Sequence, residues 1–154
     1  MFSVFDVARY FLTKSKPGTE YAITHLKLQK IVYYAQAWHI ALKNKPLFKE
    51  RIEAWIHGPV CPELYDYYKE YGFEEIDPVS SKSVSINDKD TKEVLDFVWE
   101  LYGNRSGKFL EQLTHQEDPW LNARGTLGEY IRSNNEISHE SMYEYFSKFL
   151  KETV

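Results

Sequence analysis

The chain has 154 residues, enough for one domain that buries a sizeable core without disulfides or metals. Its net charge of −4 argues against general nucleic-acid binding, because affinity for a phosphate backbone depends on clustered Lys and Arg. We expect a soluble, cytoplasmic protein, since the sequence has one cysteine, no signal-peptide pattern and no apolar run near the ~18 residues that cross a bilayer.

A first helix is predicted from Ser3 to about Leu12. Asp6 follows Ser3 at the spacing of a helix start, and the apolar residues that come next fall on one helical stripe. Pro17 and Gly18 then interrupt the pattern.

The second predicted helix runs from the N-cap Thr24 to Leu42 and is rich in aromatic residues. Its apolar residues recur at the spacings of an amphipathic helix, and others widen the apolar surface beyond one stripe. We therefore expect this helix to be central and nearly surrounded, with a short polar face. That polar face consists of Lys27, Lys30, Gln36 and Lys43.

A strand, a turn and a third helix are expected next. Residues 52–56 alternate as in a short strand, and residues 57–62 are expected to turn the chain. Pro62 suits the first position of a helix that ends at Gly72 and directs Tyr65 inward. Residues 73–88 are polar, but residues 79–86 could form a second strand against 52–56.

Helical periodicity returns in the last third of the chain. Helices are predicted over 90–102, after Ser106, after a turn at 115–120, and after the cap Ser138. The buried stripe of the last helix is expected to consist of Met142, Tyr145, Phe146 and Phe149. The predicted fold class is mainly α: one compact helical domain over residues 1–154 around the central aromatic-rich helix, with room for a small two-stranded β element.

The sequence contains no recognisable catalytic or cofactor motif. Its five histidines do not pair with other ligands at helical spacing, and it has no CxxC, Walker or GxSxG motif. His57 and Cys61 come nearest to a metal site, but zinc needs three or four ligands. Cys61 assisted by His57 would be a nucleophile and base, yet a lone cysteine is more often buried and inert. We expect no catalytic residue, no metal and no cofactor.

Three segments together resemble a known family. They are residues 27–39 (KLQKIVYYAQAWH), residues 46–65 (with PLF and EAWIHGPVCPELY) and residues 113–120 (LTHQEDPW). They resemble the Panacea-domain family, which includes SocA-like antitoxins and phage-associated GepA-type proteins. Cys61 stands where this family more often has an aliphatic residue. The motif positions that we expect to be structural are Leu28, Gln29, Trp38, Trp55, Gly58, Pro59, Pro62, Tyr65, Pro119 and Trp120.

The resemblance implies an antitoxin-type protein-binding module of bacterial or prophage origin, and not an enzyme. Such a module neutralises a cognate toxin by direct binding, and some relatives also deliver the toxin to a protease. The implied partners are therefore a toxin or another protein and, in some cases, a protease, with no membrane. The 16% aromatic content fits this role, because interfaces favour Tyr and Trp.

The distribution of charge suggests the sign of the partner. Residues 61–154 carry 10 basic and 19 acidic residues, so this acidic part could complement a basic toxin surface.

Two other classes of function stay open. A hydrolase-type enzyme would use a cleft around His57, Cys61 and His115. A nucleic-acid-binding regulator would need a contiguous basic patch that includes Lys27, Lys30 and Lys43. Each alternative places particular side chains together, so a structure discriminates between them.

The polar residues selected as partner-binding candidates are those expected to face a groove. They are Tyr33, Tyr34, His57, Glu63 and His115. Trp38, Trp55 and Trp120 are expected in the core, and Gly58, Pro59 and Pro62 are expected to set the backbone geometry.

Overall fold

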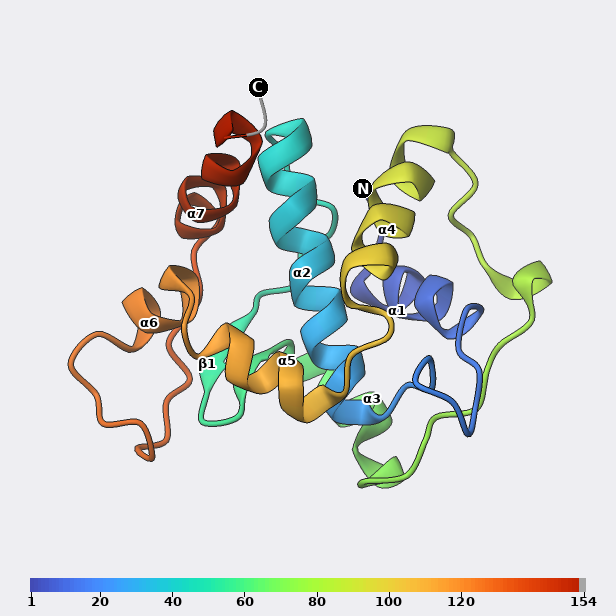
Figure 1. Cartoon of the computed structure of the whole chain (residues 1–154), viewed down its shortest axis with the longest axis horizontal. Helices are drawn as coiled ribbons and strands as arrows, with labels where there is room; N and C mark the ends of the chain where they lie inside the picture. Colours follow the sequence, from blue (N-terminus) through green and yellow to red (C-terminus); the bar gives the residue numbers. More distant parts are fainter. Residues whose placement is uncertain (153–154) are drawn as a thin grey trace.

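The computed structural model describes residues 1–152 and confirms a mainly α fold with a small two-stranded sheet. The central helix α2 (His25–Lys43) is flanked by α4 (Lys89–Tyr102) and α7 (His139–Glu152), and α5 (Gly107–Thr114) crosses its N-terminal end (Figure 1). The other elements are α1 (Val4–Leu12), β1 (Glu53–Trp55), β2 (Gly58–Val60), α3 (Pro62–Tyr68), η1 (Lys69–Tyr71), η2 (Ser81–Ser83) and α6 (Asp118–Arg124).

Polar side chains fix the helix starts as the sequence predicted. Ser3 and Asp6 form both halves of a capping box on α1. The Thr24 hydroxyl accepts the N–H of Lys27, 3.3 Å away, and Ser138 caps α7 in the same way. These local hydrogen bonds set where each helix begins.

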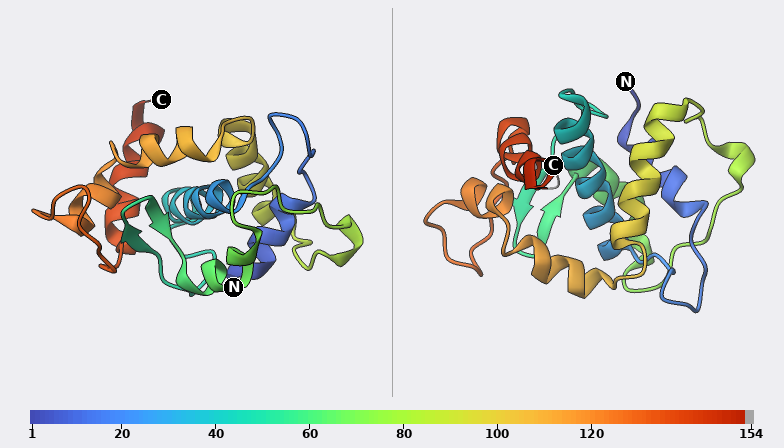
Figure 2. Two further views of the ribbon diagram at one scale, coloured as in Figure 1. Left: turned by 90° about the horizontal axis from the view of Figure 1, so that it is seen from below. Right: turned by 45° about the horizontal axis from the view of Figure 1, so that its top comes forward.

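The expected polar face of α2 is wrong at three of its four positions. Lys27, Lys30 and Gln36 are at most 2% exposed, and only Lys43 reaches solvent. The other elements surround α2 on all sides when it is viewed nearly end-on (Figure 2). The error has a physical cause, because a lysine can be buried when carbonyl oxygens accept its N–H donors.

Lys27 is buried with all of its hydrogen-bond donors paired. Its Nζ donates to the carbonyl oxygens of Glu20, Ala22 and Gly103 at 3.0, 2.8 and 2.6 Å. An ammonium group has three donors, so all of them are paired. Burial lowers the pKa of Lys27 to about 8, and the nearby Glu20 acts in the opposite direction. The side chain ties α2 to the loop before it and to the end of α4.

Gln36 ties α2 to the segment that follows it. Its Oε1 accepts the N–H of Leu47 at 2.7 Å, and its Nε2 donates to the carbonyl oxygen of Phe48 at 2.8 Å. The backbone of residues 47–48 therefore completes its hydrogen bonds through this buried amide together with Phe2, whose N–H donates to the Leu47 carbonyl oxygen at 3.1 Å.

An aromatic cluster joins the middle of α2 to α4 and α7. The rings of Tyr34 and Tyr102 stack at 3.9 Å, and the indole N–H of Trp38 donates to the Tyr102 hydroxyl at 2.9 Å. The Tyr34 hydroxyl donates to Glu117 Oε1 at 2.8 Å. Burial raises the pKa of Glu117 to about 7, although the hydrogen bond from Tyr34 acts in the opposite direction.

Tyr33 and Tyr34 are thus core residues. They are 1% and 0% exposed, so the expectation that they face a groove is wrong. The sequence could not show this, because α2 is enclosed all round and has no solvent-facing side for either ring.

The β element differs from the predicted pairing. β1 pairs antiparallel with β2, with Ala54 opposite Pro59, and Ile56 and His57 form the turn. The free edge of β1 is bonded by residues 135–137 rather than by 79–86, since the N–H of Ala54 donates to the Asn135 carbonyl oxygen at 2.8 Å. A hairpin closed by two residues costs less loop entropy than a pairing with a distant segment.

Three residues expected on buried faces reach the surface. Leu42 and Phe149 are each 41% exposed, and Tyr65 is 37% exposed. Leu42 and Phe149 lie near the ends of their helices, where fewer segments cover them, whereas Tyr65 lines a hollow described below.

The role of Gln36 can be tested by Gln36→Leu, which leaves the buried polar groups of Leu47 and Phe48 unpaired. Each such group costs about 1–3 kcal/mol, so we expect the free energy of unfolding to fall by about 2–4 kcal/mol. Urea denaturation followed by circular dichroism measures this change. Gln112→Leu at an exposed position of α5 should change it by less than about 0.5 kcal/mol, and equal effects of the two variants would contradict the assignment.

Glu117 should make the stability depend on pH. Its pKa of about 7 in the folded state lies above the ordinary value of 4.5, so the folded chain binds this proton more tightly. The resulting stabilisation is complete below pH 4.5, is lost as the pH rises through 7, and is on the order of 3 kcal/mol.

Glu117→Gln keeps an acceptor for Tyr34 but cannot titrate. The stability of the wild type relative to this variant should therefore fall between about pH 4.5 and 7 and stay constant outside that window. Urea denaturation at a series of pH values measures the difference. A difference that does not vary from pH 4.5 to 8 would rule out a raised pKa for Glu117.

Candidate functional site

A surface hollow with a volume of about 1060 Å³ lies beside the N-terminal part of α2. We call it the groove. Its walls come from α2, the β1–β2 hairpin, α3 with η1, α5, and the loop at 132–134. The residues that define it are His25, Leu26, Gln29, Lys30, Glu53, Trp55, Ile56, His57, Val60, Tyr65, Lys69, Gly72, Phe73, Lys108, Glu111, Arg132, Ser133 and Asn134.

Aromatic side chains form one wall of the groove. The Tyr65 ring lies 4.9 Å from the His25 ring and 5.0 Å from the Trp55 ring, measured between centroids. Phe73, just past η1, is 99% exposed. Phe73, Tyr65 and Trp55 line the same hollow, and aromatic side chains gathered in one hollow are a feature of surfaces that bind another molecule.

Buried polar contacts from α2 hold the base of the groove. Gln29 Oε1 accepts the backbone N–H of Cys61 at 3.0 Å, and its Nε2 lies 3.1 Å from His25 Nε2. Lys30 Nζ donates to the carbonyl oxygen of Pro59 at 3.0 Å. These contacts fix the middle of β2 and the residue that follows it against α2.

Gly58 is required at this base for two reasons. Its φ of +103° lies in the region that favours glycine, and an added Cβ would stand 2.8 Å from Lys30 Cε and 2.9 Å from Thr114 Oγ1. The glycine of the HGPV segment therefore lets the hairpin approach α2 and α5 closely.

An ion-pair cluster lies where the hairpin meets α5. Glu111 Oε2 is 3.2 Å from His57 Nδ1 and 3.4 Å from Lys108 Nζ. Burial acts to raise the pKa of Glu111, but the hydrogen bond and charge of His57, together with Lys108, outweigh it and hold the pKa below its usual value. The Glu111 side chain is 7% exposed, so it offers little free negative charge to the groove.

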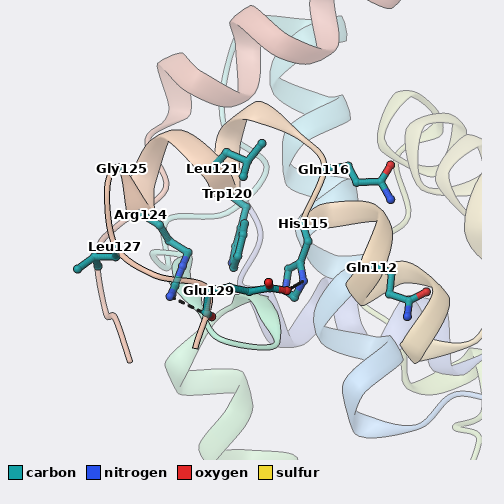
Figure 3. Close-up of a pocket in the computed structure, with 9 residues that line it drawn as sticks. All are labelled: Gln112, His115, Gln116, Trp120, Leu121, Arg124, Gly125, Leu127 and Glu129. Atoms are coloured by element: carbon teal, nitrogen blue, oxygen red, sulfur yellow. Dashed lines mark hydrogen bonds and ion pairs between the residues drawn. The ribbon is translucent and has the colours of Figure 1, made fainter. Parts of the chain in front are cut away.

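A smaller hollow, about 490 Å³, is organised around Trp120 (Figure 3). The Trp120 ring lies between His115, stacked at 4.1 Å, and the Arg124 guanidinium, 4.8 Å from the ring centroid. Arg124 donates to backbone carbonyl oxygens in β1 and in residues 128–131. The Trp120 indole N–H donates to the Trp55 carbonyl oxygen at 2.8 Å, so this hollow is linked to the hairpin.

The family is shown by comparison with known proteins. The family described as "Antitoxin SocA-like, Panacea domain" matches residues 28–121. A curated relative, Antitoxin SocA of Caulobacter vibrioides (strain NA1000 / CB15N), is 30% identical over 141 residues, which cover 82% of this chain and 74% of the relative. The chain belongs to the SocA-like Panacea-domain family. No solved structure shows significant similarity to it.

The structure separates the residues that we selected as partner-binding candidates in this SocA-like chain. His57 lines the groove and His115 lines the smaller hollow, whereas Glu63 is exposed but lines neither. Trp38 and Trp120 are buried as expected, and Trp55 is half-buried in the groove wall. Contact of His57, Glu63 or His115 with a partner stays a prediction.

Sequence reasoning missed most of the groove residues, among them Phe73, Lys108 and Arg132. Phe73 carried a usable signal, since it is a large apolar side chain between Gly72 and the acidic residues Glu74 and Glu75. Lys108 and Arg132 resemble any surface cation in the sequence, and only the fold places them beside the hairpin.

The cleft required by the hydrolase alternative does not form in this SocA-like fold. His57 and His115 line different hollows, and Cys61 lines neither. The Cys61 thiol is 2% exposed, and burial raises its pKa to about 12, which disfavours the reactive thiolate. Within residues 1–152, no group of three or more His, Cys, Asp and Glu side chains could hold a metal ion.

The structure does not support the nucleic-acid alternative, because two of the three lysines that it requires at the surface are buried. Lys27 and Lys30 are 2% and 0% exposed, so they cannot form a surface patch with Lys43.

Among the helices of the described residues, none is long and apolar enough to span a membrane.

Proposed function

We propose that this SocA-like protein acts as an antitoxin that binds a toxic partner protein directly, with the groove as its contact surface. Membership of the SocA-like family supports an antitoxin role. The proposal adds the mode of action and the place on the molecule where the partner binds.

The exposure of Phe73 is the observation that carries the choice of surface. Its ring is 99% exposed and lies in the same hollow as the Tyr65 and Trp55 rings. Aromatic side chains in a pocket dominate the binding energy of many interfaces, since they bury a large area with little loss of side-chain entropy.

The base of the groove also suits a binding role. Gln29 and Lys30 hold the hairpin through buried hydrogen bonds, so the groove wall is set before any partner arrives. A preformed surface loses less entropy on association than one that must be ordered.

The proposal is tested by co-expressing the chain with each protein encoded next to its gene. One neighbour should inhibit growth when expressed alone, and the chain should restore growth and co-purify with that neighbour. If none of the neighbours is toxic, or if rescue occurs without a complex, direct neutralisation is wrong.

Phe73→Ser tests the surface. We expect the variant to weaken the complex at least about tenfold and to reduce rescue, because a hot-spot aromatic typically contributes more than about 1 kcal/mol. Titration calorimetry measures the affinity. Tyr130→Ser is the matched control, since Tyr130 is 81% exposed and lines neither hollow. Equal affinities of the two variants would place the contact surface elsewhere.

A further inference from the structure

We infer that the groove recognises an acidic segment of the partner, in which carboxylates flank one aromatic or aliphatic anchor residue. The inference rests on the proposed function and specifies the chemistry of the partner. It follows from how charge and apolar surface are distributed around the groove.

Exposed cations from three different elements line the groove. Lys69 comes from η1, Lys108 from the first turn of α5, and Arg132 from the loop before α7. All three are exposed, and Arg132 forms no ion pair within residues 1–152. Lys108 is paired with Glu111, 3.4 Å away, and Lys69 lies 3.6 Å from Asp66. The Lys69–Asp66 pair is exposed on both sides, and such pairs contribute little, so Lys69 and Arg132 remain available to a ligand.

The two groove acids are already engaged. Glu53 Oε2 pairs with Arg51 Nε at 3.1 Å, and its Oε1 accepts the Trp55 indole N–H at 2.9 Å. Glu111 is held between His57 and Lys108. Arg51 balances Glu53 and Lys108 balances Glu111, which leaves Lys69 and Arg132 as the exposed cations of the groove that are not paired with a groove acid, although the chain as a whole carries −4.

The sign is opposite to the one suggested by the sequence. The acidic excess of residues 61–154 favours a basic partner, but Lys69, Lys108 and Arg132 come from that same part and gather at the groove. Local potential at the contact surface, rather than net charge, decides which charged partner is steered to it.

Apolar surface in the same hollow supplies the place for the anchor. Tyr65 and Phe73 are exposed, and they line the hollow that Lys69, Lys108 and Arg132 also line. A segment with carboxylates on both sides of an aromatic or aliphatic residue satisfies both features together. A basic segment would meet Lys69 and Arg132 with like charge, which disfavours association.

The test uses a phage-displayed random dodecapeptide library and two double variants of the full chain. Lys69→Glu/Arg132→Glu reverses two groove cations and leaves the His57–Glu111–Lys108 cluster intact. Lys82→Glu/Lys148→Glu makes the same change in net charge outside the groove, on exposed lysines. Circular dichroism confirms that both variants fold.

The wild type and the control should enrich peptides with acidic residues around one aromatic or aliphatic residue, and the groove variant should bind these peptides at least about tenfold more weakly. Raising the salt concentration should weaken binding to the wild type. Enrichment of basic or neutral peptides, no enrichment, or equal binding by both variants overturns the inference.

Two further outcomes also overturn it. One is self-association of the chain through the groove, which sedimentation velocity detects and Phe73→Ser would abolish. The other is salt-sensitive binding of single-stranded DNA that is lost in the groove variant.

Failure of the inference can be told from failure of the proposed function. If the groove variant still neutralises the toxic neighbour while Phe73→Ser does not, the inference of an acidic partner segment is wrong and the proposed antitoxin role stands. If no neighbour is toxic, the antitoxin role falls, and the library still reports which chemistry the groove accepts.

Discussion

Burying a lysine ammonium is costly unless carbonyl oxygens accept its donors, and α2 buries two lysines. Lys27 meets three backbone carbonyl oxygens, from the loop before α2 and from the end of α4. Lys30, whose pKa burial lowers to about 7, meets Pro59 in the hairpin. Gln29 holds the same hairpin by accepting the N–H of Cys61, and Gln36 holds the further segment at residues 47–48. The packing of hairpin, loops and helices around α2 depends on these contacts.

This constraint explains what the family motif does in this chain. The KLQK segment fixes the hairpin and the loop before α2, and the glutamine of YYAQAWH fixes the PLF segment. The motif residues thus build the structure that supports the groove. Phe73 and Arg132, which the proposed interface needs, lie outside the quoted motifs, and Arg132 also lies outside the matched range of 28–121. One structural scaffold can therefore present different contact residues.

Much of the fold could be predicted from local signals. The caps at Ser3, Thr24, Ser106 and Ser138 and the helical periodicity gave the correct helix positions. The burial of polar residues on α2 could not be predicted, since nothing in the local sequence shows that carbonyl oxygens from distant segments accept hydrogen bonds from Lys27. The groove was also beyond sequence reasoning, because it is assembled from five separate segments. Its acidic or basic preference depends on which acids are already paired, and that is a property of the folded chain.

The central claim is that a partner protein covers the groove rather than another face. Hydrogen–deuterium exchange of the chain, alone and with its toxic neighbour, tests this directly. The account predicts that partner binding slows exchange at residues 69–73 and 132–134, two segments that line the groove and lie far apart in the sequence. Unchanged exchange there, with protection confined to the solvent-facing sides of α4 and α7, would contradict it.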